Sequence, residues 1–152
     1  MQNSEIVFSQ SDLTRLTVEQ LPDGSTAIFD ERSKSVHSLN PSATIVWRAC
    51  ASGATLPQIM ETLAEHFGAP VDVEVAHHSI AQLQQAQLIE SNAPVDAAAM
   101  DMGRRSILKN VGSLGALAVP VVLTMTGTEQ RAYALQALSG TTTTTTTTRA
   151  ID

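Results

Sequence analysis

Eight consecutive threonine hydroxyls near the end of the chain are the groups best suited to covalent chemistry. They are Thr141, Thr142, Thr143, Thr144, Thr145, Thr146, Thr147 and Thr148. An enzyme could dehydrate, glycosylate or phosphorylate them, or esterify them to Asp152. The run has no apolar face whose burial would offset the entropy of ordering, so we expect a disordered tail. Two interpretations stay open: a substrate for modification, or a low-complexity tail produced by repeat slippage.

The other candidate groups for catalysis are histidines, and their spacing argues against an active site. His77 and His78 are adjacent, so on a helix they point about 100° apart and cannot easily share a metal ion. The sequence has no zinc-protease helix motif, glycine-rich phosphate loop or nucleophile elbow. Cys50 is the single cysteine, which excludes an intrachain disulfide, and it lies in an apolar helical pattern typical of a small buried residue. We therefore predict a protein that is not an enzyme, with no catalytic residue, metal site or cofactor.

A candidate export segment precedes the threonine run. Residues 103–109 resemble the twin-arginine export motif, Ser/Thr-Arg-Arg-x-Phe-Leu-Lys, but Gly103 and Ile107 depart from it. The matching residues are Arg104, Arg105, Leu108 and Lys109. The apolar run at 111–122 is shorter than the roughly 20 residues of a membrane-spanning helix and suits the apolar region of a signal peptide.

A small-x-small cleavage pattern follows at Ala132 and Ala134, and cleavage after Ala134 would release residues 135–152 with the whole threonine run. The position is unusual, because such signals normally begin a chain. The alternative is a linker with an amphiphilic helix that rests on a membrane or on the chain's own domain. The predicted localisation is cytoplasmic, with export or membrane association of the C-terminal segment left open.

Charge divides the chain into two parts. Residues 1–100 contain four Lys/Arg and twelve Asp/Glu, a net charge of −8, whereas residues 101–152 contain five Lys/Arg and three Asp/Glu, a net charge of +2. Nucleic-acid affinity comes mainly from Lys and Arg that neutralise phosphates. The acidic part therefore argues against a nucleic-acid partner and against a DNA-binding regulator.

The acidic part has the pattern of a small α+β domain. Alternating residues and turn sequences predict a three-stranded antiparallel sheet with strands at 13–19, 26–30 and 35–39. Three helices are predicted to follow, with N-caps at Asn40, Thr55 and Asp72. Gly53 and Gly68 end the first two helices, and the third runs to about residue 88, where a short final strand could follow.

Three segments carry a family resemblance. They are Thr26–Glu31, Val36–Trp47 with its Leu39-Asn40 and Val46-Trp47 pairs, and Ile59–Phe67. Over residues 10–90 the chain resembles PqqD-like peptide chaperones, also called RiPP recognition elements. The resemblance implies a winged helix-turn-helix-like domain in which a leader peptide adds as a strand to the third strand and lies against the third helix.

Transferred to this sequence, the resemblance implies ten peptide-binding residues. They are Ser35, Val36, His37, Ser38, Leu39, Val73, His77, Ile80, Ala81 and Gln84. For Ile80 and Leu83 the pattern favours a place in the core over a peptide contact, and Trp47 is likewise interpreted as core rather than as a peptide contact. Proline at position 37 is predicted to remove an edge N–H and weaken peptide binding while leaving the fold largely intact.

The predicted organisation is a peptide-recognition domain at 1–90, a linker at 91–103, the twin-arginine-like segment at 104–134, and a disordered threonine-rich core peptide at 135–152. The C-terminal tail is expected to be largely flexible, with one apolar segment that could be helical. The leading hypothesis is a recognition domain fused to its own substrate, with a leader peptide, a modifying enzyme and export machinery as partners. The alternative is a free-standing chaperone that presents a separate precursor peptide to the modifying enzyme.

Overall fold

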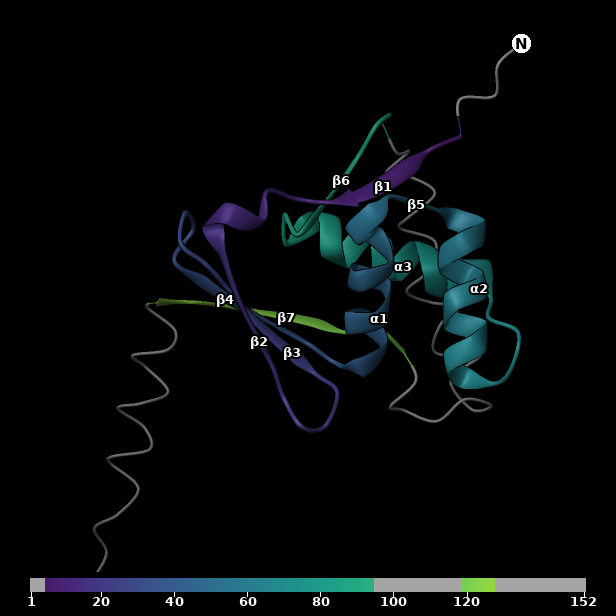
Figure 1. The fold of residues 1–152 in the computed structure, drawn as a ribbon, viewed down its shortest axis with the longest axis horizontal. Coiled ribbons are helices and arrows are strands. Elements are labelled where there is room, and N and C mark those ends of the chain that lie inside the picture. Colours follow the sequence, from purple (N-terminus) through teal and green to yellow (C-terminus); the bar gives the residue numbers. More distant parts are fainter. Residues whose placement is uncertain (1–4, 95–118, 128–152) are drawn as a thin grey trace, which may run out of the picture.

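The computed structural model describes residues 5–94 and 119–127, which form two antiparallel sheets and three α-helices (Figure 1). The elements in chain order are β1 (Val7–Gln10), the 3₁₀ turn η1 (Leu13–Arg15), β2 (Leu16–Gln20), β3 (Thr26–Asp30), β4 (Ser35–Leu39), α1 (Pro41–Ala49), the 3₁₀ turn η2 (Cys50–Ser52), β5 (Ala54–Thr55), α2 (Leu56–Phe67), α3 (Val73–Gln85), β6 (Ile89–Ser91) and β7 (Val122–Thr126). The predicted α+β class is therefore confirmed. The winged-helix relationship stays a prediction.

The predicted meander of β2, β3 and β4 is present, and polar turns set its register. In the first turn the Asp23 carboxylate accepts the N–H of Ser25 at 3.0 Å, and Gly24 adopts a φ of 86° that suits glycine. In the second turn the carboxylate of Asp30 accepts the N–H of Arg32 at 2.8 Å. These turns place Ile28 opposite His37 in the β3–β4 ladder.

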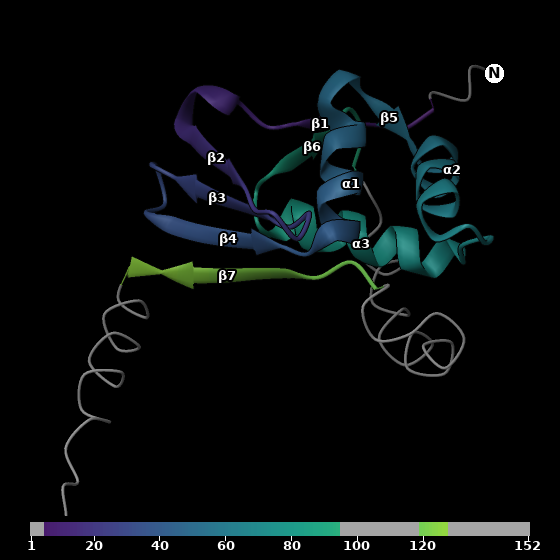
Figure 2. The same ribbon diagram turned by 60° about the horizontal axis from the view of Figure 1, so that its bottom comes forward.

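A fourth strand extends this sheet, so the expectation of three strands was wrong. β7 pairs antiparallel with β4 along its whole length, from Leu39 opposite Val122 to Ser35 opposite Thr126. The strand order is β2-β3-β4-β7, and Figure 2 shows β7 along the edge of the sheet, next to β4. β7 lies within the predicted apolar segment 104–134. The part of that segment which forms β7 is a strand rather than a helix.

A second, smaller sheet has the order β5-β1-β6. β1 and β5 were not predicted, because each is short and β1 buries only Phe8 fully. β6 corresponds to the short strand that could follow the third helix. The contacts of this sheet continue to Asn92, whose side-chain Oδ1 accepts the Val7 N–H at 2.9 Å and whose own N–H donates to the Val7 carbonyl.

The three helices begin where the capping residues predict. Asn40 Oδ1 accepts the N–H of Ala43 at 2.9 Å at the start of α1, and Asp72 accepts the N–H of Glu74 at 3.0 Å at the start of α3. Thr55 donates its N–H to the Gln58 side chain before α2, and Gly68 ends that helix with a φ of 66°. None of the described helices is long and apolar enough to cross a membrane.

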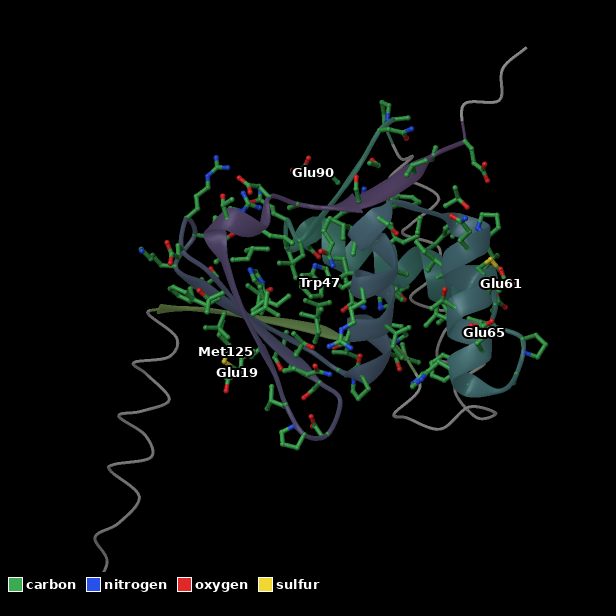
Figure 3. All side chains as sticks on the ribbon, in the orientation of Figure 1. Glu19, Trp47, Glu61, Glu65, Glu90 and Met125 are labelled. Carbon is green, nitrogen blue, oxygen red and sulfur yellow. The ribbon has the colours of Figure 1, made fainter. Side chains whose placement is uncertain are left out.

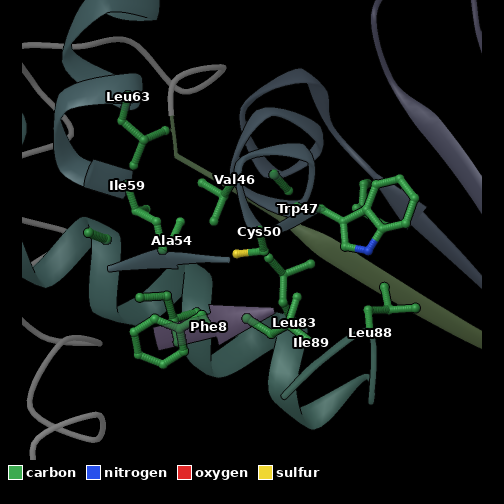
Figure 4. Packing of buried hydrophobic residues seen from close by; sticks show 14 of the residues in the cluster. Phe8, Val46, Trp47, Cys50, Ala54, Ile59, Leu63, Leu83, Leu88 and Ile89 are labelled. Carbon is green, nitrogen blue, oxygen red and sulfur yellow. The ribbon is translucent and has the colours of Figure 1, made fainter. Parts of the chain in front are cut away.

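The core lies where the three helices, the small sheet and one face of the larger sheet meet. Its buried members include Phe8, Ile28, Leu39, Val46, Trp47, Cys50, Ile59, Leu63, Ile80, Leu83 and Leu88. In Figure 4, Cys50 lies near the centre of this cluster, with Phe8 and Trp47 on opposite sides of it. Cys50 is fully buried in the core, as the sequence predicted, and this burial raises the pKa of its thiol to about 11.

Candidate peptide-binding site

The site is the edge of β4 together with the neighbouring face of α3, and β7 occupies it. The Asn40 N–H donates to the Val121 carbonyl at 3.1 Å, so the chain at position 40 faces β7. Since N–H direction alternates along a strand, the N–H groups of Ser38 and Val36 also point toward β7, whereas those of His37 and Leu39 point toward β3. Proline at position 37 would therefore break the β3–β4 ladder. Position 38 is where proline removes an edge N–H.

Asn40 joins the sheet edge to α1 and also binds the chain entering β7. Its side-chain Nδ2 donates to the Val119 carbonyl at 2.8 Å. Its Oδ1 accepts the Val121 N–H at 3.0 Å as well as the capping N–H of Ala43. From the sequence, Asn40 was recognised only as a helix cap; its second role depends on a segment about 80 residues away.

Gln82 makes the matching contact from α3. Its Nε2 donates to the Pro120 carbonyl at 2.9 Å, and its Oε1 accepts the Val122 N–H at 2.9 Å. A side-chain amide has one donor and one acceptor side, so it pairs with a strand as another backbone would. We call Asn40 and Gln82 the amide clamp. Sequence reasoning missed Gln82, because a glutamine on a helix is typical of a solvated surface.

His37 lies on the inner face of β4 beneath β7. Its side chain is almost fully buried, and its Nδ1 lies 2.9 Å from the Thr124 Oγ1. Its Nε2 is buried and has no hydrogen-bond partner among the described residues. Burial lowers the pKa of His37 below its usual value of 6.5; the nearby Asp30 carboxylate opposes this shift and the Arg15 guanidinium reinforces it.

The lowered pKa predicts that the folded domain is less stable in acid. Because His37 resists protonation in the folded protein, its contribution to the free energy of unfolding is complete above the usual pKa of about 6.5 and is progressively lost as the pH falls below it. Chemical denaturation at several pH values between about 7.5 and 5 would measure this. A His37→Gln variant should lose the dependence; an unchanged pH profile in that variant would show that another group is responsible.

The ten residues implied by the resemblance separate into two groups. Ser35, Val36, His37, Ser38 and Leu39 all lie opposite β7. The helix residues do not: Ile80 is fully buried in the core, Gln84 donates to the Ser91 Oγ at 3.3 Å, and Val73 is 41% exposed. His77 and Ala81 are half-buried and do not line the groove between α3 and β7.

That groove has a volume of about 580 Å³ and uses a different face of α3. It is lined by His78, Gln82, Gln85, Ala86, Val121, Val122 and Thr124. The helix residues that contribute to it have the i, i+4, i+7 and i+8 spacing of a single helix face. This lining contains no Lys, Arg, Asp or Glu; side-chain amides, the Thr124 hydroxyl, the His78 imidazole and aliphatic side chains define the groove.

The remaining predicted sites lie outside the described residues. They are the export motif at Arg104, Arg105, Leu108 and Lys109, the cleavage residues Ala132 and Ala134, and the threonines from Thr141 to Thr148.

The family comparison covers the part of the chain that contains the candidate site. Residues 25–89 match the family model of coenzyme PQQ synthesis protein D (PqqD), a span that runs from β3 to the start of β6 and includes β4, Asn40 and Gln82. No curated protein and no solved structure matches the chain. PqqD proteins are non-catalytic chaperones that bind precursor peptides and cooperate with modifying enzymes. Residues 25–89 of this chain are therefore similar to the PqqD family.

Proposed function

We propose that this protein recognises its own C-terminal half as its peptide substrate. Residues 119–126 act as the leader and bind β4 as an added strand, and the threonine-rich tail is the part that a modifying enzyme alters. The observation that carries the proposal is the five-residue antiparallel pairing of β7 with β4. Addition of a strand to an exposed sheet edge is a general mode of peptide recognition, in which backbone hydrogen bonds supply affinity.

Covalent fusion supports binding within one chain. A segment of the same chain is held near the site at a high effective concentration, so even a weak leader would occupy it. The amide clamp and the His37–Thr124 contact add side-chain interactions to the ladder. These contacts bind residues 119–124, so the chain beyond Thr126 is the part that would be presented to an enzyme.

The order of segments suits presentation of the tail. β7 ends at Thr126, opposite Ser35, and fourteen residues separate it from Thr141. The predicted cleavage residues Ala132 and Ala134 lie within this interval, so cleavage there would separate the tail from the recognition domain. In this proposal the export motif acts after release, because the apolar run at 111–122 shares Val119, Pro120, Val121 and Val122 with the docked segment.

The test is the intact mass of the full chain co-expressed with the enzymes encoded by its neighbouring genes. We expect a mass change that maps to residues 135–152 after proteolysis, and no mass change once those residues are deleted. An unmodified tail under these conditions would contradict the proposal. If the truncated chain instead supports processing of a separate small peptide, the protein is a free-standing chaperone.

A further inference from the structure

We propose that the site selects peptides with the pattern proline-x-aliphatic-x-threonine, and that it recognises the proline by its missing N–H. This inference rests on the proposed function, since it names the peptide class that the same site accepts. The residues that carry it lie between positions 119 and 124. Pro120 is fully buried and Val122 packs against the core, whereas Leu123 is 55% exposed. Thr124 is exposed but its hydroxyl contacts His37, and Val121 is 37% exposed and lines the groove.

The backbone around Pro120 is almost fully paired. Asn40 takes the Val119 carbonyl and both polar groups of Val121, and Gln82 takes the Pro120 carbonyl and the Val122 N–H. These contacts pair every backbone N–H and carbonyl from the Val119 carbonyl to the Val122 N–H. Position 120 contributes no N–H, because it is a proline.

Any other residue at position 120 would bring a donor into this place. Pro120 is among the fully buried residues, and the acceptor oxygens of the amide clamp are already engaged: Asn40 Oδ1 accepts from Val121 and Ala43, and Gln82 Oε1 accepts from Val122. A buried N–H without an acceptor loses its hydrogen bonds to water and gains none. Proline also enters with its φ already restricted, which lowers the entropy lost on docking.

Thr124 supplies the second element of the pattern. Its hydroxyl is 2.9 Å from His37 Nδ1, the ring nitrogen that has a partner, while Nε2 has none among the described residues. A peptide with an aliphatic residue at this position would leave both nitrogens of a buried imidazole unpaired. Between these two positions, Val122 packs against the hydrophobic core.

The test uses a full-length chain in which residues 119–126 are replaced by glycine and serine, so that β4 is free. Fluorescein-labelled synthetic peptides covering residues 117–128 are then titrated and followed by anisotropy. We expect the Pro120→Ala peptide to bind about ten- to hundredfold more weakly than the wild-type peptide, and the Thr124→Val peptide about five- to tenfold more weakly. The Leu123→Ala peptide is the matched control, because Leu123 points to solvent, and it should bind within about threefold of wild type.

N-methylalanine at position 120 separates the missing N–H from the packing of the ring. It has no N–H and no pyrrolidine ring, so we expect it to recover most of the affinity lost in the Pro120→Ala peptide. No recovery would overturn recognition through the N–H, and equal binding of the wild-type and Pro120→Ala peptides would overturn selection of proline altogether. If no peptide binds, the proposed function itself fails, which distinguishes the two results.

Discussion

Replacing Ser38 with proline is expected to release β7 from β4 while the β2–β3–β4 meander remains folded. The Ser38 N–H points toward β7, so proline removes one hydrogen bond of the ladder and places its ring against the docked strand. Ser38 is exposed and lies on the outer face of the sheet, so its own side chain contributes little to the core. Hydrogen–deuterium exchange resolved to single residues would measure the effect. The N–H groups of Leu123 and Met125, which face β4 by the same alternation, should lose their protection.

The matched control is His37→Pro, one residue away. Its N–H points toward β3, so this variant should lose the meander and unfold at lower temperature, whereas Ser38→Pro should melt like the wild type apart from the loss of β7. Retained protection of Leu123 in folded Ser38→Pro would mean that β7 does not depend on this edge.

The second large effect is expected for Ile80→Ala. The family resemblance implied that Ile80 contacts the peptide, but its side chain is fully buried in the hydrophobic core. Truncation of a buried isoleucine leaves a cavity, and we expect the free energy of unfolding to fall by about 2–5 kcal/mol. Chemical denaturation followed by circular dichroism would measure the change.

Gln85→Ala is the control for Ile80→Ala, because Gln85 is exposed on the same helix and should change stability by no more than about 0.5 kcal/mol. If Ile80→Ala kept wild-type stability yet lost the docked strand, Ile80 would be a peptide contact after all, and its assignment to the core would be wrong.

The domain's elements were largely predictable because their ends carry local signals. Asn40, Thr55 and Asp72 cap helices in a way that depends on neighbours within three residues, and Gly68 adopts the left-handed conformation that ends α2. The β3–β4 pairing follows from a short polar turn. Such features need no knowledge of the remaining fold.

β7 could not be recognised in the same way. Val121, Val122 and Leu123 continue an apolar run, and an uninterrupted run does not distinguish a strand from the apolar region of a signal. The strand becomes evident only beside β4, where the inward side chains meet the domain and the outward ones do not. Met125 is 39% exposed, and the ladder register places it on the outer face of the sheet, the same face as Glu19 of β2; Figure 3 labels both, away from Trp47 in the core.

The face of α3 that borders the groove could not be predicted from the local sequence pattern either. The apolar spacing identifies the buried side of the helix, including Ile80 and Leu83, but two flanking faces remain. Which of them borders the edge of β4 depends on how the helix crosses the sheet. The role of Gln82 follows from its half-buried position in the structure, where its side-chain amide needs hydrogen-bond partners.

The central claim, that residues 122–126 bind β4 of the same molecule, is tested most directly by cross-strand contacts in solution. In the antiparallel β4–β7 ladder, His37–Thr124 and Leu39–Val122 are the pairs without mutual hydrogen bonds, with Cα atoms only about 4.5 Å apart. We predict Hα–Hα nuclear Overhauser effects for both pairs in the full chain, and none between molecules in a mixture of labelled and unlabelled protein. The β3–β4 pairs Ala27–Ser38 and Phe29–Val36 provide the internal standard. Two results would contradict the account. One is that the β3–β4 contacts are seen while those of Val122 and Thr124 with β4 are missing; the other is that the β4–β7 contacts arise only between molecules.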